Sequence, residues 1–180
     1  FPLTKITNKH LLPVYDKPMI YYPIQTLVAA GIRDILIVTG GRNSGDFLRL
    51  LANGKQFGLN HINYTYQEGE GGIADALSLC ENFADDRPIC VVLGDNIIEG
   101  NIRRAADDYR RQGKGAKILL KKVPDPNRFG VPVLQPGALH LDFGREGRVV
   151  VDALEFRFGG VAVVRVNAPL FHVGEEGLEF

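Results

Sequence analysis

The sequence predicts an α/β fold with a doubly wound, mostly parallel sheet and a partly antiparallel subregion after residue 123. Two short, continuously apolar, β-branched runs, residues 35–38 and 89–93, are typical of strands that helices cover on both faces. Segments with helical spacing alternate with strand-like segments, which favours right-handed crossovers between parallel strands. In such sheets ligands bind at the carboxyl ends of the strands, so the residues that follow the strands are candidates for a site.

The predicted elements follow in a regular order along the chain. Apolar residues recur at helical spacing over residues 18–30, and Gly31 suits the end of that helix. After the first buried strand, a Gly-rich turn leads into a helix over residues 46–51. The remaining elements are a strand at residues 62–67, a helix at 73–83, the second fully buried strand at 89–93, a helix at 101–112 and a strand at 116–121.

The texture of the chain changes after residue 123. Four prolines fall between residues 124 and 136, and short β-like runs follow at residues 148–151 and 161–166. A length of 180 residues is ordinary for one domain with a single substantial core. We therefore expect one domain, residues 1–180, with a core of residues 1–123 and a mixed, partly antiparallel subregion of residues 124–180 for a second substrate.

Charge and apolar content argue against two classes of partner. Lysine plus arginine and aspartate plus glutamate both number 21, so no net field attracts nucleic acid or an anionic membrane. No apolar run approaches the roughly 18 to 20 residues of a membrane-spanning helix, and the first residues lack the order of a signal peptide. We therefore expect a cytoplasmic protein without nucleic-acid or membrane partners.

The cysteines and histidines lack the spacing of a metal site or a redox motif. Cys80 lies in a helical pattern and Cys90 in a strand pattern, and we expect both to be buried thiols. Each histidine is interpreted as solvated or as hydrogen-bonded within the fold; the four are His10, His61, His140 and His172.

Residues 9–23 form the most specific motif of the chain. They read Lys-His-Leu-Leu-Pro-Val-Tyr-Asp-Lys-Pro-Met-Ile-Tyr-Tyr-Pro. This run resembles the signature of glucose-1-phosphate thymidylyltransferases of the short form, Lys-x-Leu-Leu-Pro-Val-Tyr-Asp-Lys-Pro-Met-Ile-Tyr-Tyr-Pro, and the resemblance extends from residue 1 to about residue 131. It implies a Rossmann-like nucleotidyltransferase sheet with a sugar-binding subregion. It also implies a homo-oligomer, commonly a tetramer, that joins dTTP and glucose 1-phosphate with Mg²⁺ and forms dTDP-glucose and pyrophosphate for deoxysugar (dTDP-rhamnose type) biosynthesis.

Asp95 and Lys9 are the candidate charged residues of the site. Asp95 follows a buried strand in Leu-Gly-Asp-Asn, where a carboxylate suits Mg²⁺ but equally suits the cap of the next turn. Lys9 precedes an apolar segment, from which its ammonium reaches either a phosphate at the sheet edge or solvent. The resemblance implies that Asp95 is the catalytic magnesium ligand and that Lys9 neutralises phosphate charge in nucleotide binding and catalysis.

Gln67 ends a predicted strand, and glycines and a helix follow it. A glutamine amide both donates and accepts hydrogen bonds, as reading the edge of a pyrimidine requires, and the glycines permit close backbone approach. Taken alone, the pattern is only a strand, a loop and a helix. The segment resembles the family's Gln and Gly-Gly-Ile-Ala sequence around the thymine base, which implies base-binding roles for Gln67 and Gly72.

Residues 125–131 read Asp-Pro-Asn-Arg-Phe-Gly-Val, which by themselves indicate only a Pro-led turn. The run resembles the family's Asp-Pro-x-Arg-Phe-Gly-Val turn, whose glycine amide contacts the sugar. The resemblance therefore implies a sugar contact for Gly130.

Three features that the resemblance implies are not found in the sequence. They are a loop of the type Gly-Gly-x-Gly-Thr-Arg-Leu before Phe1, a Glu-Lys-Pro segment after residues 147–150, and a Thr-Asp pair, with the second metal ligand, after Phe180. Because all three fall at ligand-facing loops or chain ends, we expect a longer natural chain that carries the loop and the second aspartate.

Two alternatives differ in class from this enzyme. One is a catalytically inactive relative that binds a nucleotide or a sugar nucleotide as a regulatory module, which the missing glycine loop and the missing lysine of the Glu-Lys-Pro segment favour. The other is an NAD(P)-dependent oxidoreductase, because residues 37–45 vaguely resemble a dinucleotide-binding turn. That segment lacks the Gly-x-Gly-x-x-Gly spacing, and no tyrosine of the sequence has a lysine four residues further on, so the second alternative is the weaker.

Overall fold

The computed structural model describes residues 6–41, 43–69, 71–113, 116–119 and 161–165. Contacts within the chain divide it into two compact units, one of residues 1–114 and 157–180 and one of residues 115–156. Every helix and strand named below belongs to the first unit. The predicted boundary at residues 123 and 124 stays a prediction.

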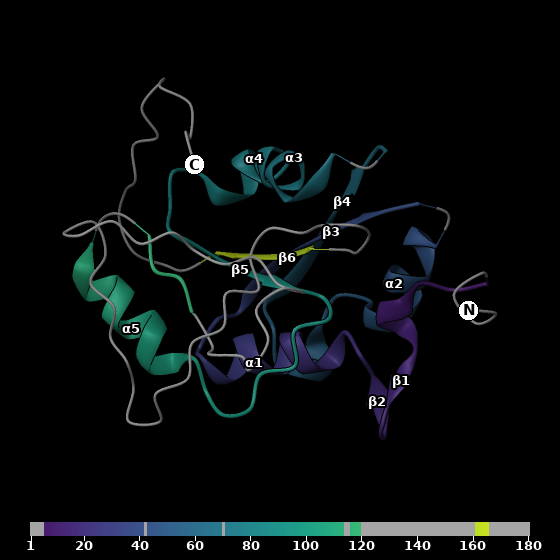
Figure 1. Cartoon of the computed structure of the whole chain (residues 1–180), viewed down its shortest axis with the longest axis horizontal. Helices are drawn as coiled ribbons and strands as arrows, with labels where there is room; N and C mark the ends of the chain where they lie inside the picture. Colours follow the sequence, from purple (N-terminus) through teal and green to yellow (C-terminus); the bar gives the residue numbers. More distant parts are fainter. Residues whose placement is uncertain (1–5, 42, 70, 114–115, 120–160, 166–180) are drawn as a thin grey trace, which may run out of the picture. The chain divides into compact units, whose positions relative to one another are not determined.

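Within the described residues, four strands form the central sheet of the first unit. They lie in the order β4 (His61–Gln67), β3 (Asp34–Gly40), β6 (Val161–Arg165) and β5 (Ile89–Leu93), as Figure 1 shows. β3 and β4 are parallel, and β6 is antiparallel to both β3 and β5. β3, β4 and β5 therefore run in one direction, and the predicted α/β fold with a mostly parallel sheet is confirmed.

β6 supplies the antiparallel character that we expected after residue 123. Val161 lies opposite both Val38 of β3 and Leu93 of β5, so this strand is inside the central sheet. The expected strand at residues 148–151 lies outside the described residues. The expected strand at residues 116–121 is wrong in its described part, because residues 116–119 have no regular structure. Ile118 and Leu119 are more than half exposed, and a short apolar run becomes a strand only where a neighbouring strand accepts it.

Helices cover both faces of β3, whose side chains alternate between two clusters. Ile35 and Ile37 pack in one cluster with α1 (Tyr21–Ala29) and α2 (Ser44–Leu51). Leu36 and Val38 pack in the other with α3 (Gly72–Ser78), and Figure 1 shows α1 and α3 on opposite sides of the sheet. Both faces of β3 are buried, as the apolar run predicts.

Two expectations about buried elements are corrected. β5 is not fully buried: Val92 is 5% exposed but Val91 is 39% exposed, because β5 lies at the end of the four-strand order. Its Cys90 is only partly buried, whereas Cys80 is fully buried. Burial raises the pKa of both thiols to about 11, so both stay protonated and unreactive at neutral pH.

The helix expected at residues 73–83 is interrupted. It forms α3 and then α4 (Glu81–Ala84), because the Cys80 amide donates to Leu77 O at 2.9 Å and tightens the chain to a three-residue repeat. The last helix among the described residues is α5 (Arg103–Gln112). Among the helices of the described ranges, none is long and apolar enough to cross a membrane.

The motif of residues 9–23 folds as a short turn, a hairpin and the start of α1. A 3-10 turn η2 (Lys9–Leu11) precedes the hairpin strands β1 (Pro13–Val14) and β2 (Lys17–Pro18). The Tyr22 hydroxyl donates to Val14 O at 2.7 Å, which anchors the hairpin on the helix. This arrangement carries Lys9 to the site and gives the hairpin residues a structural role.

Candidate functional site

The strand register brings the residues after β3, β4 and β5 to one edge of the sheet. Gly40 lies opposite Gln67 at the ends of β3 and β4. Val38 and Leu93 both lie opposite Val161, so β5 ends at nearly the same level as its neighbours. This carboxyl edge is where a parallel sheet binds its ligands.

Lys9 and Asp95 meet at this edge from distant parts of the chain. Lys9 Nζ lies 2.6 Å from Asp95 Oδ2, in an ion pair whose side chains are 40% and 36% exposed. The turn after β5 is closed by Asn96, which donates its backbone amide to Leu93 O and accepts from Leu93 N at 3.1 Å. Asn96 thus closes the turn after β5. The carboxylate of Asp95, the residue before it, contacts Lys9 instead.

The charge state of Asp95 follows from its neighbours. Burial opposes ionisation, but the hydrogen bond and the charge of Lys9 outweigh it, so the pKa of Asp95 lies below its usual value. A carboxylate is therefore present at neutral pH.

His10 is buried beside this pair and is satisfied by hydrogen bonds. Asn8 Oδ1 accepts from the backbone amide of His10 at 3.0 Å and lies 2.7 Å from its Nδ1. Because that oxygen can only accept, Nδ1 carries the hydrogen. Burial, with a smaller contribution from Lys9, lowers the pKa of His10 to about 4 against the opposing effect of Asp95, so the ring is neutral. The structural interpretation of this histidine is confirmed, and His61 is exposed, as expected of a solvated histidine.

Gln67 and Gly72 lie together at the end of β4. Gln67 Nε2 donates to Gly72 O at 2.9 Å and to Asp75 Oδ2 at 2.6 Å. Gly72 has a φ of +81°, a left-handed conformation that favours glycine. The structure therefore brings together the two residues expected at the base and adds Asp75 of α3 to them.

Sequence reasoning did not single out Asp75. It is an exposed acid in a helical pattern, eight residues after Gln67, and no sequence signal distinguishes it from a solvated residue. Gly130 lies outside the described residues. The ion pair near β5 and the amide cluster on β4 are separated by three strand spacings, about 14 Å.

The site offers one carboxylate as a ligand for a metal ion. Within the described ranges, no three His, Cys, Asp or Glu side chains gather as a metal cluster. Asp95 offers one ionised, partly exposed carboxylate. Mg²⁺ is typically held by one or two carboxylates, with water and substrate phosphates as its other ligands, so this arrangement fits it.

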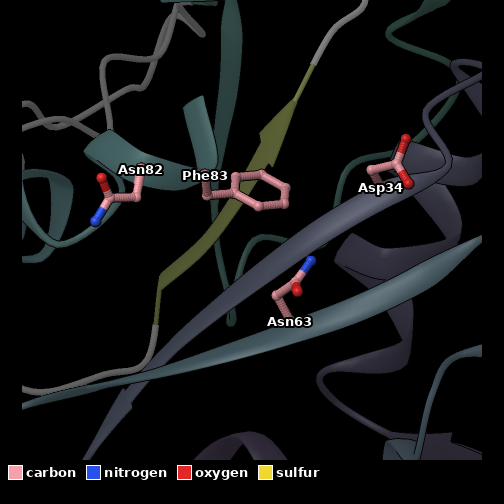
Figure 2. Close-up of a pocket in the computed structure, with 4 residues that line it drawn as sticks. All are labelled: Asp34, Asn63, Asn82 and Phe83. Carbon is pink, nitrogen blue, oxygen red and sulfur yellow. The ribbon is translucent and has the colours of Figure 1, made fainter. Parts of the chain in front are cut away.

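A separate hollow lies on the face of the sheet that α3 and α4 cover. Figure 2 shows its lining, in which the Phe83 ring reaches over the sheet among Asp34, Asn63 and Asn82. Asp34 begins β3, so the hollow extends toward the end of the sheet opposite the carboxyl edge. It contains none of the residues that the sequence singles out.

Comparisons with known proteins identify the family. The sequence model of the nucleotidyl transferase family matches residues 1–147. The glucose-1-phosphate thymidylyltransferase of Neisseria meningitidis is 43% identical over 132 residues, which are 73% of this chain and 46% of that protein. That of Xanthomonas campestris pv. campestris is 43% identical over 155 residues, which are 83% of this chain and 48% of that protein.

A solved structure supports the same assignment. A crystal structure assigned as a glucose-1-phosphate thymidylyltransferase from Bacillus anthracis, in complex with sucrose, is 37% identical. It superposes with a TM-score of 0.72 over 92% of this chain and 65% of that chain. The chain spans about half the length of the curated relatives it matches. The resemblance seen in the sequence is confirmed at the level of the family, and the chain belongs to the nucleotidyl transferases.

Proposed function

We propose that this chain carries the nucleotide-binding part of an enzyme that joins dTTP and glucose 1-phosphate to give dTDP-glucose and pyrophosphate. The observation that carries the proposal is the pairing of Lys9 with Asp95 at the same sheet edge as the cluster of Gln67 and Gly72. One place has groups for phosphate and metal, and the other has groups for a base. An extended nucleotide, with its base at one end and its phosphates at the other, can bridge the two.

Lys9 and Asp95 can exchange partners at little cost. A partly exposed ion pair of this kind is worth only about 0 to 1 kcal/mol. Lys9 would then turn to a phosphate oxygen, and the Asp95 carboxylate would hold Mg²⁺. When bound there, Mg²⁺ supplies charge neutralisation at the phosphates.

The reaction requires positioning more than covalent chemistry from the protein. An oxygen of the sugar phosphate attacks the α-phosphorus of dTTP in line, and the bond from that phosphorus to the bridging oxygen breaks to release pyrophosphate. Lys9 would stabilise the negative charge that the phosphates carry in the transition state. Gln67 and Gly72 would hold the base, which fixes the α-phosphorus relative to the sugar phosphate. Gly130 is expected to contact the sugar.

Release of pyrophosphate tests this proposal directly. We expect release to require dTTP, glucose 1-phosphate and Mg²⁺ together, and dTDP-glucose to form in equal amount. A hydrolase would release phosphate or pyrophosphate from dTTP without the sugar phosphate. Binding of dTTP without any release would instead support the inactive relative.

The assembly and the location of the protein stay predictions. The resemblance implies a homo-oligomer, commonly a tetramer, and the composition favours a cytoplasmic protein without nucleic-acid partners. Size-exclusion chromatography with light scattering would measure the number of subunits.

A further inference from the structure

We propose that Asp75 is a positioning residue that fixes the direction of the Gln67 amide, so that the site takes a pyrimidine with a hydrogen on N3 and rejects cytosine. The inference rests on the proposed role of Gln67 in reading the base. It goes beyond that role because it assigns the choice among pyrimidines to a residue that would not touch the base.

The contacts of Gln67 leave its amide one orientation. Both hydrogens of Nε2 have partners, Gly72 O at 2.9 Å and Asp75 Oδ2 at 2.6 Å. A backbone carbonyl and a carboxylate can only accept hydrogen bonds. Rotating the amide by half a turn would place Oε1 against these two oxygens, and three acceptors would then face one another. Nε2 therefore stays directed at Gly72 and Asp75, and Oε1 is the atom of the Gln67 amide that remains for a ligand.

This orientation changes what Gln67 can read. A free glutamine amide can offer either its donor or its acceptor, so it does not by itself distinguish thymine from cytosine. With Nε2 committed, Gln67 offers only an acceptor. Thymine and uracil carry a hydrogen on N3 and can donate to Oε1, whereas N3 of cytosine is itself an acceptor. Facing Oε1, cytosine would leave two acceptors opposed and unpaired.

The loop before α3 leaves room for the Asp75 carboxylate. A Cβ at Gly71 would lie 2.6 Å from Asp75 Oδ2, closer than real Cβ contacts allow, so the carboxylate occupies the space that this glycine leaves open. The hydrogen bond from Gln67 to a carboxylate is also stronger than one to a neutral acceptor. Asp75 lies in the first turn of α3, where an acid also favours the helix. That second role affects stability and not the choice of base.

Titration calorimetry with dTTP, dUTP and dCTP, each with Mg²⁺, tests the inference. We expect the unmodified protein to bind dTTP and dUTP at least about tenfold more tightly than dCTP. Asp75→Ala and Asp75→Asn should both reduce that ratio about three- to tenfold, chiefly because dCTP binds better. Asp75→Asn keeps the side-chain volume but can present either a donor or an acceptor. Glu81→Ala, which removes an acid from the first turn of α4, is the matched control and should leave the ratio unchanged.

The outcomes separate this inference from the proposed function. If both Asp75 variants keep the full ratio while Gln67→Ala loses it, Gln67 reads the base and the role of Asp75 is overturned. If the ratio falls in Asp75→Ala but not in Asp75→Asn, packing and not a fixed acceptor is responsible, and the inference is again overturned. If Gln67→Ala leaves dTTP affinity and the ratio unchanged, the base-reading role itself fails, and the inference fails with it.

Discussion

The charge of Asp95 is the property of the site most open to a single substitution. Asp95→Asn keeps the volume of the side chain and removes the carboxylate that we expect to hold Mg²⁺. Turnover should fall by at least about a hundredfold, as when one charge-stabilising group is lost, while the melting temperature changes little because the ion pair is partly exposed. Mg²⁺-dependent pyrophosphate release measures the effect. Asp107→Asn on α5, which also breaks an ion pair, is the control and should keep full turnover.

His10 gives stability a dependence on pH. Its pKa is about 4 in the folded protein, because of burial, and its ordinary value is 6.5. Between these values the unfolded chain binds a proton that the folded chain does not, so the free energy of unfolding falls as pH decreases from about 6.5 to 4, by at most about 3 kcal/mol. Urea denaturation at several pH values measures the slope. His10→Gln should flatten it across this window, and parallel curves for the two proteins would contradict the assignment.

At the scale of elements, the link between α2 and β4 shows how glycines place an aromatic contact. The 3-10 turn η3 (Lys55–Phe57) begins after Gly54 and ends at Gly58, and both glycines have positive φ angles. The turn brings Phe57 edge-on to Tyr21 of α1, with ring centroids 4.8 Å apart. The left-handed residues therefore position a contact between the link and the helix that follows the hairpin.

We expect alanine substitutions at the two glycines to lower the free energy of unfolding by different amounts. At Gly54 an added Cβ would lie 2.7 Å from Ile62 Cγ1, whereas at Gly58 it would meet nothing within 4 Å. Gly58→Ala should cost only the left-handed strain, about 1 to 2 kcal/mol. Gly54→Ala should cost about 1 to 3 kcal/mol more, because overpacking is added to the same strain. Urea denaturation of both variants checks the difference, and equal costs would mean that the space around Ile62 adjusts freely.

Across the whole molecule, local patterns predicted the elements better than their pairing. The run at residues 35–38 is apolar and β-branched, and β3 forms there because those properties are local. The place of β6 could not be predicted, because its partners lie far away in sequence and a short apolar run does not specify its neighbours. For the same reason the strand expected at residues 116–121 was wrong in its described part: Ile118 and Leu119 are apolar, but residues 116–119 have no regular structure.

Part of the candidate site could likewise be predicted from the sequence, and part of it could not. That Lys9 and Asp95 lie at one edge follows from the rule that ligand groups follow parallel strands, together with a specific motif. The contact of Gln67 with Asp75 depends on the turn at Gly71 and Gly72, and no spacing in the sequence indicates it. The direction of a hydrogen bond depends on the folded arrangement. The sequence alone therefore indicates a Gln67 amide that can both donate and accept, and only its contacts with Gly72 and Asp75 fix its orientation.

Burial in the apolar cluster that α1, α2 and β3 share contributes to the stability of all three elements. Leu27 of α1 is 0% exposed in the cluster that covers β3, whereas Leu48 of α2 is 52% exposed. Leu27→Ala should lower the free energy of unfolding by about 2 to 5 kcal/mol, a large part of the roughly 5 to 15 kcal/mol of a typical protein, while Leu48→Ala should change it by less than about 0.5 kcal/mol. Urea denaturation measures both.

Leu27 contributes no group to the carboxyl edge, so the folded Leu27→Ala protein should keep its affinity for dTTP. If the variant loses affinity for dTTP in the absence of denaturant, at a temperature well below its melting temperature, the packing of α1 also sets the geometry of the site.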